Sequence, residues 1–461
     1  MVEEQIPKKY NNLTMELASF INKTTFSDLP KEVVEKAKLH IRDGLGNQLA
    51  ASKISESAKI AMELIKEFGG AQQAPVVGYG TLLPLPFANM INAMLGHGVE
   101  LDDAHSSALT KAGCVLVPTA LGTGYYLKKS GKEIITALVV GYDVSIRIGQ
   151  SINPGHRKRG YHTSGTANTF GAAAVVSKLL DLDVEHTAWA LGLAGMQAAG
   201  IQAYLTDPCL AKPFSPGKAA FNGTLAALLA SKGLSGPRKI LEGEEGFFKA
   251  YTDEVRWSDF DDLGLKFKIM EVGFKPHAAC RYAHGPIDAA QIIFEKYRPR
   301  LEDIKEINVK MSPLAIRQSG KKNLQNLNMA MGSTPFGVVL ALYSGKNNLN
   351  DYIEGFNNEL LRKMTSNVNL IPIDWDGEAG RSAEVEVILK DGQKFVHRVK
   401  GPKGDPDNPM TNEELKIKFE GLARLALSNE DVEILNSNLM RFEQLPNVLD
   451  IMEIVSGRPK R

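Results

Sequence analysis

The segment TANTFGAAAVVSKLLDL, residues 166–182, decides the fold class of this 461-residue chain. Alanine, glycine and valine would lie on all sides of a helix formed by this segment, rather than on one stripe. Helices of this kind are usually buried among other helices, because small side chains let two backbones approach closely. EIITALVVGYDVSIRIGQ (133–150) and KAAFNGTLAALLASKG (218–233) have the same character. We therefore expect a core in which helices pack against helices.

More helices are predicted towards the N-terminus. LPKEVVEKAKLHIRDGLGNQLAA (29–51) has apolar residues at three- and four-residue intervals, and Leu29-Pro30 is a start signal. SESAKIAMELIKEFGG (55–70) repeats this pattern and stops at Gly69-Gly70, a C-cap. The first 270 residues or so read as helix after helix.

The pattern changes after about Met270. EDIKEINVKMS (302–312) alternates like a strand, and AEVEVILKDGQKFVHRV (383–399) predicts a hairpin with its turn at Asp391-Gly392. TNEELKIKFEGLARLAL (411–427) returns to a helical pattern, with Thr411 as N-cap.

We therefore predict a mainly α protein with two domains. A large all-helical domain is built from both chain ends, residues 1–270 and 406–461. A smaller α+β domain, residues 271–405, is inserted between them. The chain is long enough for this arrangement, since single cores rarely grow beyond about 250–300 residues.

Composition excludes several classes of partner. The balance of 54 basic and 53 acidic residues gives a formal net charge of +1, which offers no electrostatic case for nucleic acid or an anionic membrane. No window reaches the roughly 20 apolar residues of a membrane span, and residues 1–23 lack the apolar core of a signal peptide. The three distant cysteines suit a reducing compartment. We expect a cytoplasmic protein with no nucleic-acid or membrane partner.

The stretch GHGVELDDAH (96–105) concentrates titratable groups beside an apolar run. If it is helical, His97, Glu100 and Asp103 or Ala104 share one face; alternatively, the helix ends near Gly98 and ELDDAHSS is a loop at its mouth. In both cases crowded carboxylates raise at least one pKa, which creates a usable proton donor or acceptor. Glu100, Asp103 and His105 are the candidate acid–base residues. Neither HxxxH nor HExxH spacing occurs, so no metal is expected.

Three further clusters carry cations and histidines. In the first (153–173), His162 precedes small hydroxyl residues at the start of a helix, where an anion could bind. The second (207–223) places Lys212 before a proline-bracketed turn and has Lys218 starting a small-residue helix. The third (273–290) contains Lys275, His277, Arg281 and His284 within ten residues. Together with the carboxylates, these groups suit cofactor-free proton chemistry on a small polycarboxylate.

The four clusters, in this order, resemble the MmgE/PrpD family, which includes 2-methylcitrate dehydratase, cis-aconitate decarboxylase and iminodisuccinate epimerase. The likeness extends through LEGEEGFFKAY (241–251), KPHAACRYAHGPIDAA (275–290) and PKGDPDNPMTNEELKIKF (402–419). The resemblance implies a helical domain built from both chain ends, an inserted α+β lid domain, a homodimer, and no required metal or cofactor.

The resemblance also assigns residues. Glu100 stands where the family has its leading catalytic aspartate, and Ala104 where a threonine often contacts substrate. The family's glycine–aromatic–histidine–threonine element falls on residues 160–163, which supports His162 as catalytic and Thr163 as substrate-binding. Lys212 and Lys275 fall on two family lysines, with His277 beside Lys275 as a further substrate-binding candidate.

One departure concerns the position of a histidine that is catalytic in the decarboxylase branch. Here Thr110 or Lys111 occupies that place. A lysine can bind a carboxylate, but it is a poor acid–base near neutral pH unless it is strongly desolvated.

The leading hypothesis is a cofactor-independent lyase of the dehydratase type, acting on a small di- or tricarboxylate by α-proton abstraction. In it, Glu100, Asp103, His105 and His162 share acid–base duties, while Lys111, Lys212, Lys275, His277 and Thr163 hold the substrate. The alternatives are a dicarboxylate isomerase resembling iminodisuccinate epimerase, and a non-catalytic family member that binds a metabolite.

Overall fold

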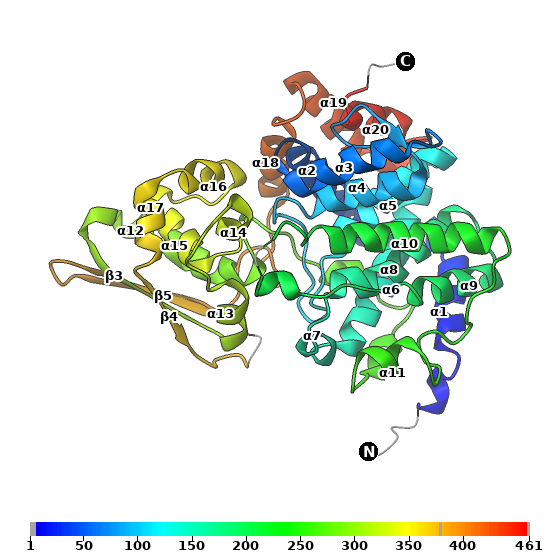
Figure 1. Cartoon of the computed structure of the whole chain (residues 1–461), viewed down its shortest axis with the longest axis horizontal. Coiled ribbons are helices and arrows are strands. Elements are labelled where there is room, and N and C mark those ends of the chain that lie inside the picture. The colour runs from blue at the N-terminus through cyan, green and yellow to red at the C-terminus, as the bar shows by residue number, and fades with distance from the viewer. Residues whose placement is uncertain (1–5, 208, 378–379, 459–461) are drawn as a thin grey trace. The chain divides into compact units, whose positions relative to one another are not determined.

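The computed structural model describes residues 6–207, 209–377 and 380–458 (Figure 1). The chain divides into two compact units, which we describe separately. Unit 1 consists of Met1–Gly98, Asp102–Val272 and Leu415–Arg461, and unit 2 of Val99–Leu101 and Gly273–Glu414. Helices dominate the described residues, so the mainly α prediction is confirmed.

Unit 1 contains the helices of both chain ends. They are α1 (Leu13–Lys23), α2 (Lys31–Ile54), α3 (Glu56–Phe68), α4 (Leu85–Gly96), α5 (Gly113–Leu127), α6 (Gly131–Ile152), α7 (Gly155–Lys158), α8 (Thr163–Leu179), α9 (Val184–Gly195), α10 (Phe214–Ser231), α11 (Phe247–Tyr251), α18 (Asn412–Ala423, whose first residues belong to unit 2), α19 (Asn429–Met440) and α20 (Leu449–Ser456).

Helix α8, which contains residues 166–179 of the segment 166–182, lies at the centre of unit 1 and packs against α5, α6, α9 and α10 (Figure 1). Small residues make this packing possible. A Cβ at Gly171 would come within 2.8 Å of the Ser145 Cβ on α6, and one at Gly223 within 2.5 Å of the Ala172 Cβ. The predicted close approach of alanine- and glycine-rich helices is therefore what the structure shows.

Two local predictions need correction. The described part of unit 1 is not purely helical, because β1 (Ala74–Pro75) and β2 (Leu82–Leu83) pair antiparallel where the chain reverses through Gly78 and Gly80, both with positive φ. Lys218 does not start a helix, since α10 begins four residues earlier, at Phe214. Pro213 and Pro216 explain this start, because proline is tolerated in the first turn of a helix.

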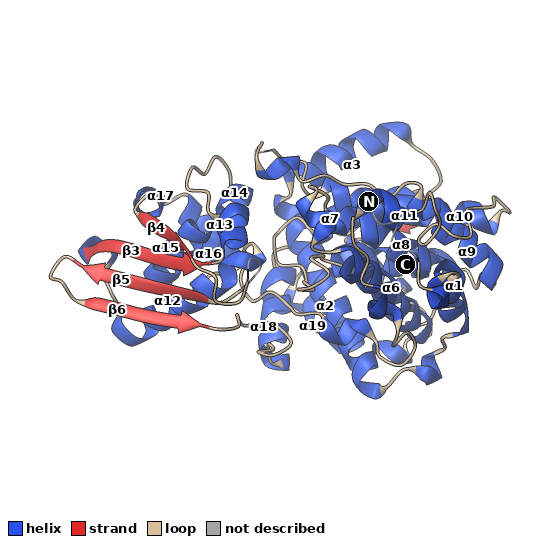
Figure 2. Cartoon of the chain, turned by 90° about the horizontal axis from the view of Figure 1, so that it is seen from below, coloured by secondary structure: helices blue, strands red, loops and turns tan. Residues whose placement is uncertain are grey.

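Unit 2 holds a four-stranded sheet in the order β4-β3-β5-β6 (Figure 2). Strand β3 pairs parallel with β4 and antiparallel with β5, and β5 and β6 form the predicted hairpin. Helix α12 packs on β5 and β6. The elements are α12 (His284–Tyr297), β3 (Ile304–Met311), α13 (Pro313–Ser319), α14 (Leu327–Met331), α15 (Thr334–Ser344), α16 (Leu349–Phe356), α17 (Glu359–Thr365), β4 (Val368–Pro372), β5 (Ala383–Leu389) and β6 (Lys394–Val399).

Among the described residues, every helix is too short or too polar to pass through a lipid bilayer.

Candidate active site

The acidic loop, residues 97–112, joins α4 to α5. Helix α4 ends at Gly96, where a Cβ would come within 3.0 Å of the Cys114 carbonyl oxygen at the start of α5. The ends of the two helices approach so closely that a side chain at position 96 would clash with α5. Helix α4 ends at this glycine. Of the two interpretations of the stretch 96–105, the loop is right and the helix is wrong.

Asp103 ties the acidic loop to three helices. Its carboxylate accepts hydrogen bonds from the Gly113 N–H at 2.9 Å and from the Tyr142 hydroxyl at 2.5 Å, and His40 Nδ1 lies 3.1 Å away. Burial lowers the pKa of His40 and raises the pKa of Tyr142 well above its usual value. The space that His40 and Asp103 help to line is too narrow for a water molecule. These contacts describe an anchor for the loop, and the acid–base role of Asp103 stays a prediction.

His97 and Asp102 form a buried pair at the start of the loop, with Nδ1 2.6 Å from Oδ2. A nitrogen, an oxygen and a sulfur of His97, Asp102 and Cys114 lie within 4.8 Å of one another. Zinc sites of the structural type need four ligands, with cysteine as thiolate. Here burial raises the thiol pKa well above its usual value, and the thiol donates to the Lys111 carbonyl at 3.3 Å. Among the described residues this trio offers three candidate ligand atoms, fewer than a structural zinc site needs, and the absence of a metal stays a prediction.

His162 is the N-cap of α8. Its backbone N–H donates to the Gly200 carbonyl at 3.0 Å, and its own carbonyl accepts from Gly165 at 2.8 Å. The ring is 3% exposed, and its Nδ1 has no hydrogen-bond partner among the described residues. Burial, followed by the positive charges of His97 and others, holds the pKa of His162 well below its usual value. The imidazole is therefore neutral at neutral pH, which is the form that accepts a proton.

Thr110 and Lys111 lie against the first turns of α8. The Thr110 hydroxyl donates to Asn168 Oδ1 at 3.0 Å, and the Lys111 backbone N–H donates to Ser164 Oγ at 3.1 Å. Asn168 Nδ2 donates in turn to the Lys111 carbonyl at 2.7 Å. The two positions that replace the family's histidine are therefore fixed on the helix that His162 caps.

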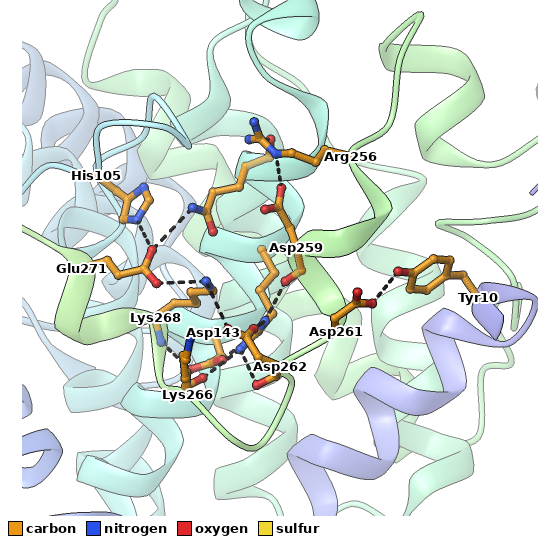
Figure 3. A network of polar contacts seen from close by, with 12 residues as sticks. Tyr10, His105, Asp143, Arg256, Asp259, Asp261, Asp262, Lys266, Lys268 and Glu271 are labelled. Carbon is orange, nitrogen blue, oxygen red and sulfur yellow. Dashed lines mark hydrogen bonds and ion pairs between the residues drawn. The ribbon is translucent and has the colours of Figure 1, made fainter. Parts of the chain in front are cut away.

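His105 takes part in a different network, shown in Figure 3. Its Nδ1 accepts from the Ala108 N–H at 3.1 Å, and its Nε2 lies 3.2 Å from a Glu271 carboxylate oxygen. The Lys268 ammonium donates to Glu271 at 2.9 Å. Both ring nitrogens of His105 therefore have partners, and the ring connects the acidic loop to Glu271, near the end of the segment Asp102–Val272 of unit 1. Its predicted acid–base role is not tested by this geometry.

Glu100 and Lys275 meet in unit 2. The Lys275 ammonium, fully buried, donates to the Glu100 carbonyl at 3.0 Å and lies 3.5 Å from its carboxylate. Glu100 has a φ of 55°, a left-handed conformation uncommon outside glycine. A buried ammonium needs such oxygen partners, since burying an unpaired charge is costly. The predicted acid–base residue and the predicted carboxylate-binding lysine therefore contact each other.

The other histidines of the 273–290 motif also have partners inside unit 2. His277 Nε2 lies 2.6 Å from Asp288, whose second oxygen accepts from the Lys403 N–H at 2.7 Å. His284 Nδ1 lies 3.0 Å from the Arg281 guanidinium, so this nitrogen must accept the hydrogen bond. Burial holds the pKa of His284 well below its usual value. His284 is a neutral structural residue, while His277 keeps its predicted role as a hypothesis.

The remaining predicted substrate-binding residues differ in burial. Thr163 is fully buried, and its hydroxyl accepts from Asn153 Nδ2 at 3.2 Å. Lys111 and Lys212 are half-buried. Lys212 lies just before α10, and its predicted role is untested.

Unit 1 contains a cavity of about 420 Å³ whose lining does not include His162 or the other predicted site residues. Tyr204 lines this cavity and packs edge-on against the His162 ring, with centroids 5.6 Å apart. Ser215 and Lys218 of α10 line it as well. Burial lowers the pKa of the Lys218 ammonium, which stacks over the Phe221 ring at 4.2 Å.

Two models of known protein families match most of the chain. Residues 15–259 match the MmgE/PrpD N-terminal domain, and residues 277–440 match the MmgE/PrpD C-terminal domain. The chain belongs to the MmgE/PrpD family. The resemblance inferred from the four sequence clusters is thus confirmed.

Similar members of the MmgE/PrpD family carry decarboxylase names. A cis-aconitate decarboxylase-like protein of Aspergillus oryzae is 26% identical, covering 97% of this chain and 98% of the relative. The cis-aconitate decarboxylase of Aspergillus terreus is 25% identical, with 97% and 96% covered. The Homo sapiens cis-aconitate decarboxylase is 26% identical, with 97% and 95% covered.

Sequence reasoning missed several groups around the acidic loop of this family member. His40 on α2 and Tyr142 on α6 hold Asp103, although they are 63 and 39 residues away from it. No local motif links such distant positions. The pair of His97 and Asp102 did have a signal, because both lie within the stretch 96–105, but only the fold brings their side chains together.

Proposed function

We propose that the protein is a lyase that acts on a small di- or tricarboxylate by α-proton abstraction, with dehydration as its reaction and no cofactor. The family and its decarboxylase-named relatives support a lyase. The observation that carries the proposal is His162, a buried imidazole that is neutral at neutral pH and has no hydrogen-bond partner at Nδ1 among the described residues.

His162 is the base in this proposal. Its place at the N-terminus of the 17-residue helix α8 disfavours the imidazolium form, in the same direction as burial. Removing an α-proton leaves negative charge next to a carboxylate, and the N-terminal dipole of α8 stabilises that charge. A neutral base at a helix N-terminus therefore suits proton removal more than proton donation.

Lysines hold the substrate carboxylates in the proposed reaction. Lys111 extends from the acidic loop, Lys212 precedes α10, and Lys275 contacts Glu100 in unit 2. The cavity that Tyr204 lines, about 420 Å³, is of the size that small-molecule sites have, roughly 300–1,000 Å³, and Tyr204 packs against the His162 ring. Glu100, Asp103 and His105 share the remaining acid–base work in this scheme, which includes protonation of the leaving hydroxyl.

Decarboxylation is the second candidate, favoured by the names of the relatives. Loss of carbon dioxide leaves a carbanion that must be protonated. Thr110 or Lys111 stands where the decarboxylase branch has its histidine. A hydroxyl bonded to Asn168 is a weak acid, and a lysine is a poor acid–base near neutral pH unless it is strongly desolvated. With His162 neutral, the described residues beside α8 supply a base more readily than a proton donor, which places dehydration first.

One experiment separates these reactions. The protein is incubated in heavy water with citrate-like, succinate-like and aconitate-like acids, and ¹H and ¹³C NMR follow each acid. Dehydration gives an alkene and no carbon dioxide, whereas decarboxylation releases carbon dioxide. Deuterium exchange at the α-carbon without elimination would support the epimerase alternative, and silence across all acids would support the non-catalytic alternative and overturn the proposal.

We also propose that the protein is a cytoplasmic homodimer without nucleic-acid or membrane partners. Three large apolar side chains on unit 1 support a partner surface, since Met196, Ile201 and Phe214 are each at least 49% exposed. The two exposed residues Ile201 and Phe214 border the same cavity. Light scattering after gel filtration tests the dimer, and a monomer mass at micromolar concentration would exclude it.

A further inference from the structure

The strongest unassigned feature is the contact between His97, Asp102 and His162 in unit 1. His97 ends α4, Asp102 lies five residues later in the acidic loop, and His162 caps α8. The family resemblance and the predicted site gave no role to His97 or Asp102. Both side chains are at most 1% exposed, so neither is placed there to contact solvent.

Asp102 fixes the orientation of His97. A carboxylate can only accept, so the His97 nitrogen 2.6 Å from Oδ2 must carry the proton. A contact this short between a buried imidazole and a carboxylate is a charge-assisted hydrogen bond. Cys114 borders the same carboxylate, and the negative charge of Asp102 helps to raise the pKa of the thiol. The proton on Nδ1 and the ring orientation of His97 are therefore fixed by Asp102.

The oriented His97 ring packs against His162. The two ring centroids are 5.9 Å apart with an interplanar angle of 40°. Tyr204 packs edge-on against His162 at 5.6 Å. Nδ1 of His162 lacks a hydrogen-bond partner among the described residues, so packing against these two rings contributes to the orientation of the imidazole.

We propose that His97 and Asp102 are positioning residues for His162: Asp102 fixes His97, and His97 orients the His162 ring and keeps it in the form that accepts a proton. This role rests on the proposed function of His162 as the base. It extends that function, because the pair acts through His162 and needs no contact with substrate.

The charges around His162 fit this arrangement. His97 from the end of α4, Arg157 from α7 and Lys111 from the acidic loop all disfavour protonation of His162, and Asp102 favours it. His97 is the largest of these charge effects after burial. Removing His97 takes away one effect that disfavours protonation of His162 and leaves the opposing effect of Asp102, so the pKa of His162 should rise.

The test uses the full-length protein and three variants. His97→Gln removes the ring, and Asp102→Asn removes the carboxylate. His186→Gln is the matched control, because His186 forms a similar contact with Asp183, at 2.8 Å, on the surface of α9. Each variant is checked by circular dichroism and thermal unfolding. If His97→Gln is unfolded, His97→Asn replaces it, since the Asn amide keeps a donor near the position of Nδ1.

The first readout is independent of turnover. NMR titration of ¹⁵N-labelled histidine gives the pKa of His162, identified by the signal absent in His162→Gln. We expect the His162 midpoint to rise in His97→Gln, because a group that disfavours its protonation is lost, and to be unchanged in His186→Gln. An unchanged midpoint in His97→Gln would overturn the proposed role of His97.

The second readout is the pH profile of turnover on the polycarboxylate that the wild type converts. We expect Asp102→Asn to lower kcat by about 10²-fold with a smaller change in KM, because a mispositioned base costs about that factor. In His97→Gln the acid limb of kcat should move to higher pH. Wild-type kcat in both variants would contradict the positioning role. If wild type converts no acid, the proposed function fails, and the titration still decides the role of the pair.

Discussion

Two histidines of unit 1, both predicted to be catalytic, occupy opposite environments. His105 has a partner at each ring nitrogen, the Ala108 N–H and the Glu271 carboxylate. His162 is packed between the His97 and Tyr204 rings, and its Nδ1 has no partner in the described part of the chain. The difference leads to the hypothesis that hydrogen-bond partners, more than residue type or spacing, separate an imidazole that only holds the structure together from one that takes a proton.

The largest expected effect is on His162. His162→Gln removes the proposed base, and turnover should fall by about 10³-fold, within the range of general acid–base catalysis. The thermal midpoint should change little, because the lost ring nitrogens form few hydrogen bonds. Steady-state kinetics and calorimetry measure the two quantities, with His186→Gln as control. Wild-type turnover in His162→Gln would contradict the proposal that His162, unlike His105, is the base.

The second effect concerns His156, another histidine near α8 whose two ring nitrogens both have hydrogen-bond partners. Its Nε2 accepts from the Thr166 hydroxyl at 2.8 Å, its Nδ1 donates to the Tyr251 carbonyl at 3.1 Å, and burial lowers its pKa to about 4. Thr166→Val leaves a buried nitrogen without a partner, which should cost about 1–3 kcal/mol of unfolding free energy. Urea unfolding measures this cost. A loss of turnover without loss of stability would mean that His156 belongs to the site.

A smaller effect is expected for His105. His105→Gln should lower the free energy of unfolding by about 1 kcal/mol, the net worth of a typical hydrogen bond. Turnover should fall far less than in His162→Gln, since His105 acts through the contacts shown in Figure 3. The same unfolding and kinetic assays apply. A loss of turnover equal to that of His162→Gln would establish His105 as an acid–base residue.

The smallest effect is a pH dependence at Glu271. Its hydrogen bond from His105, and then the Lys268 ammonium, lower its pKa from 4.5 to about 2. A folded-state pKa below the unfolded value stabilises the protein above pH 4.5, and this contribution is lost as pH falls towards 2. The stability difference between wild type and Glu271→Gln should therefore shrink from about pH 6 to about pH 3.5. A difference that grows on acidification would contradict the assignment.

The alanine- and glycine-rich segments fixed much of the fold class in advance. At Gly171 and Gly223 the neighbouring helices leave no room for a Cβ. The high alanine and glycine content that permits such packing can be read from each short segment of the sequence. The β5–β6 hairpin was equally readable, since its alternation and the Asp391-Gly392 turn are local. The β1–β2 pair was not, because two-residue strands carry no periodicity.

The amino-acid sequence by itself determined the mainly α class, the family and the presence of carboxylates and histidines at the stretch 96–105. Those properties depend on composition and short spacings. Only the tertiary structure decided which titratable groups are satisfied. Asp103 is held by residues from α2 and α6, and Glu100 contacts Lys275, 175 residues away. Protonation depends on burial and on partners in space, and these are set by packing between segments that the sequence does not show to be neighbours.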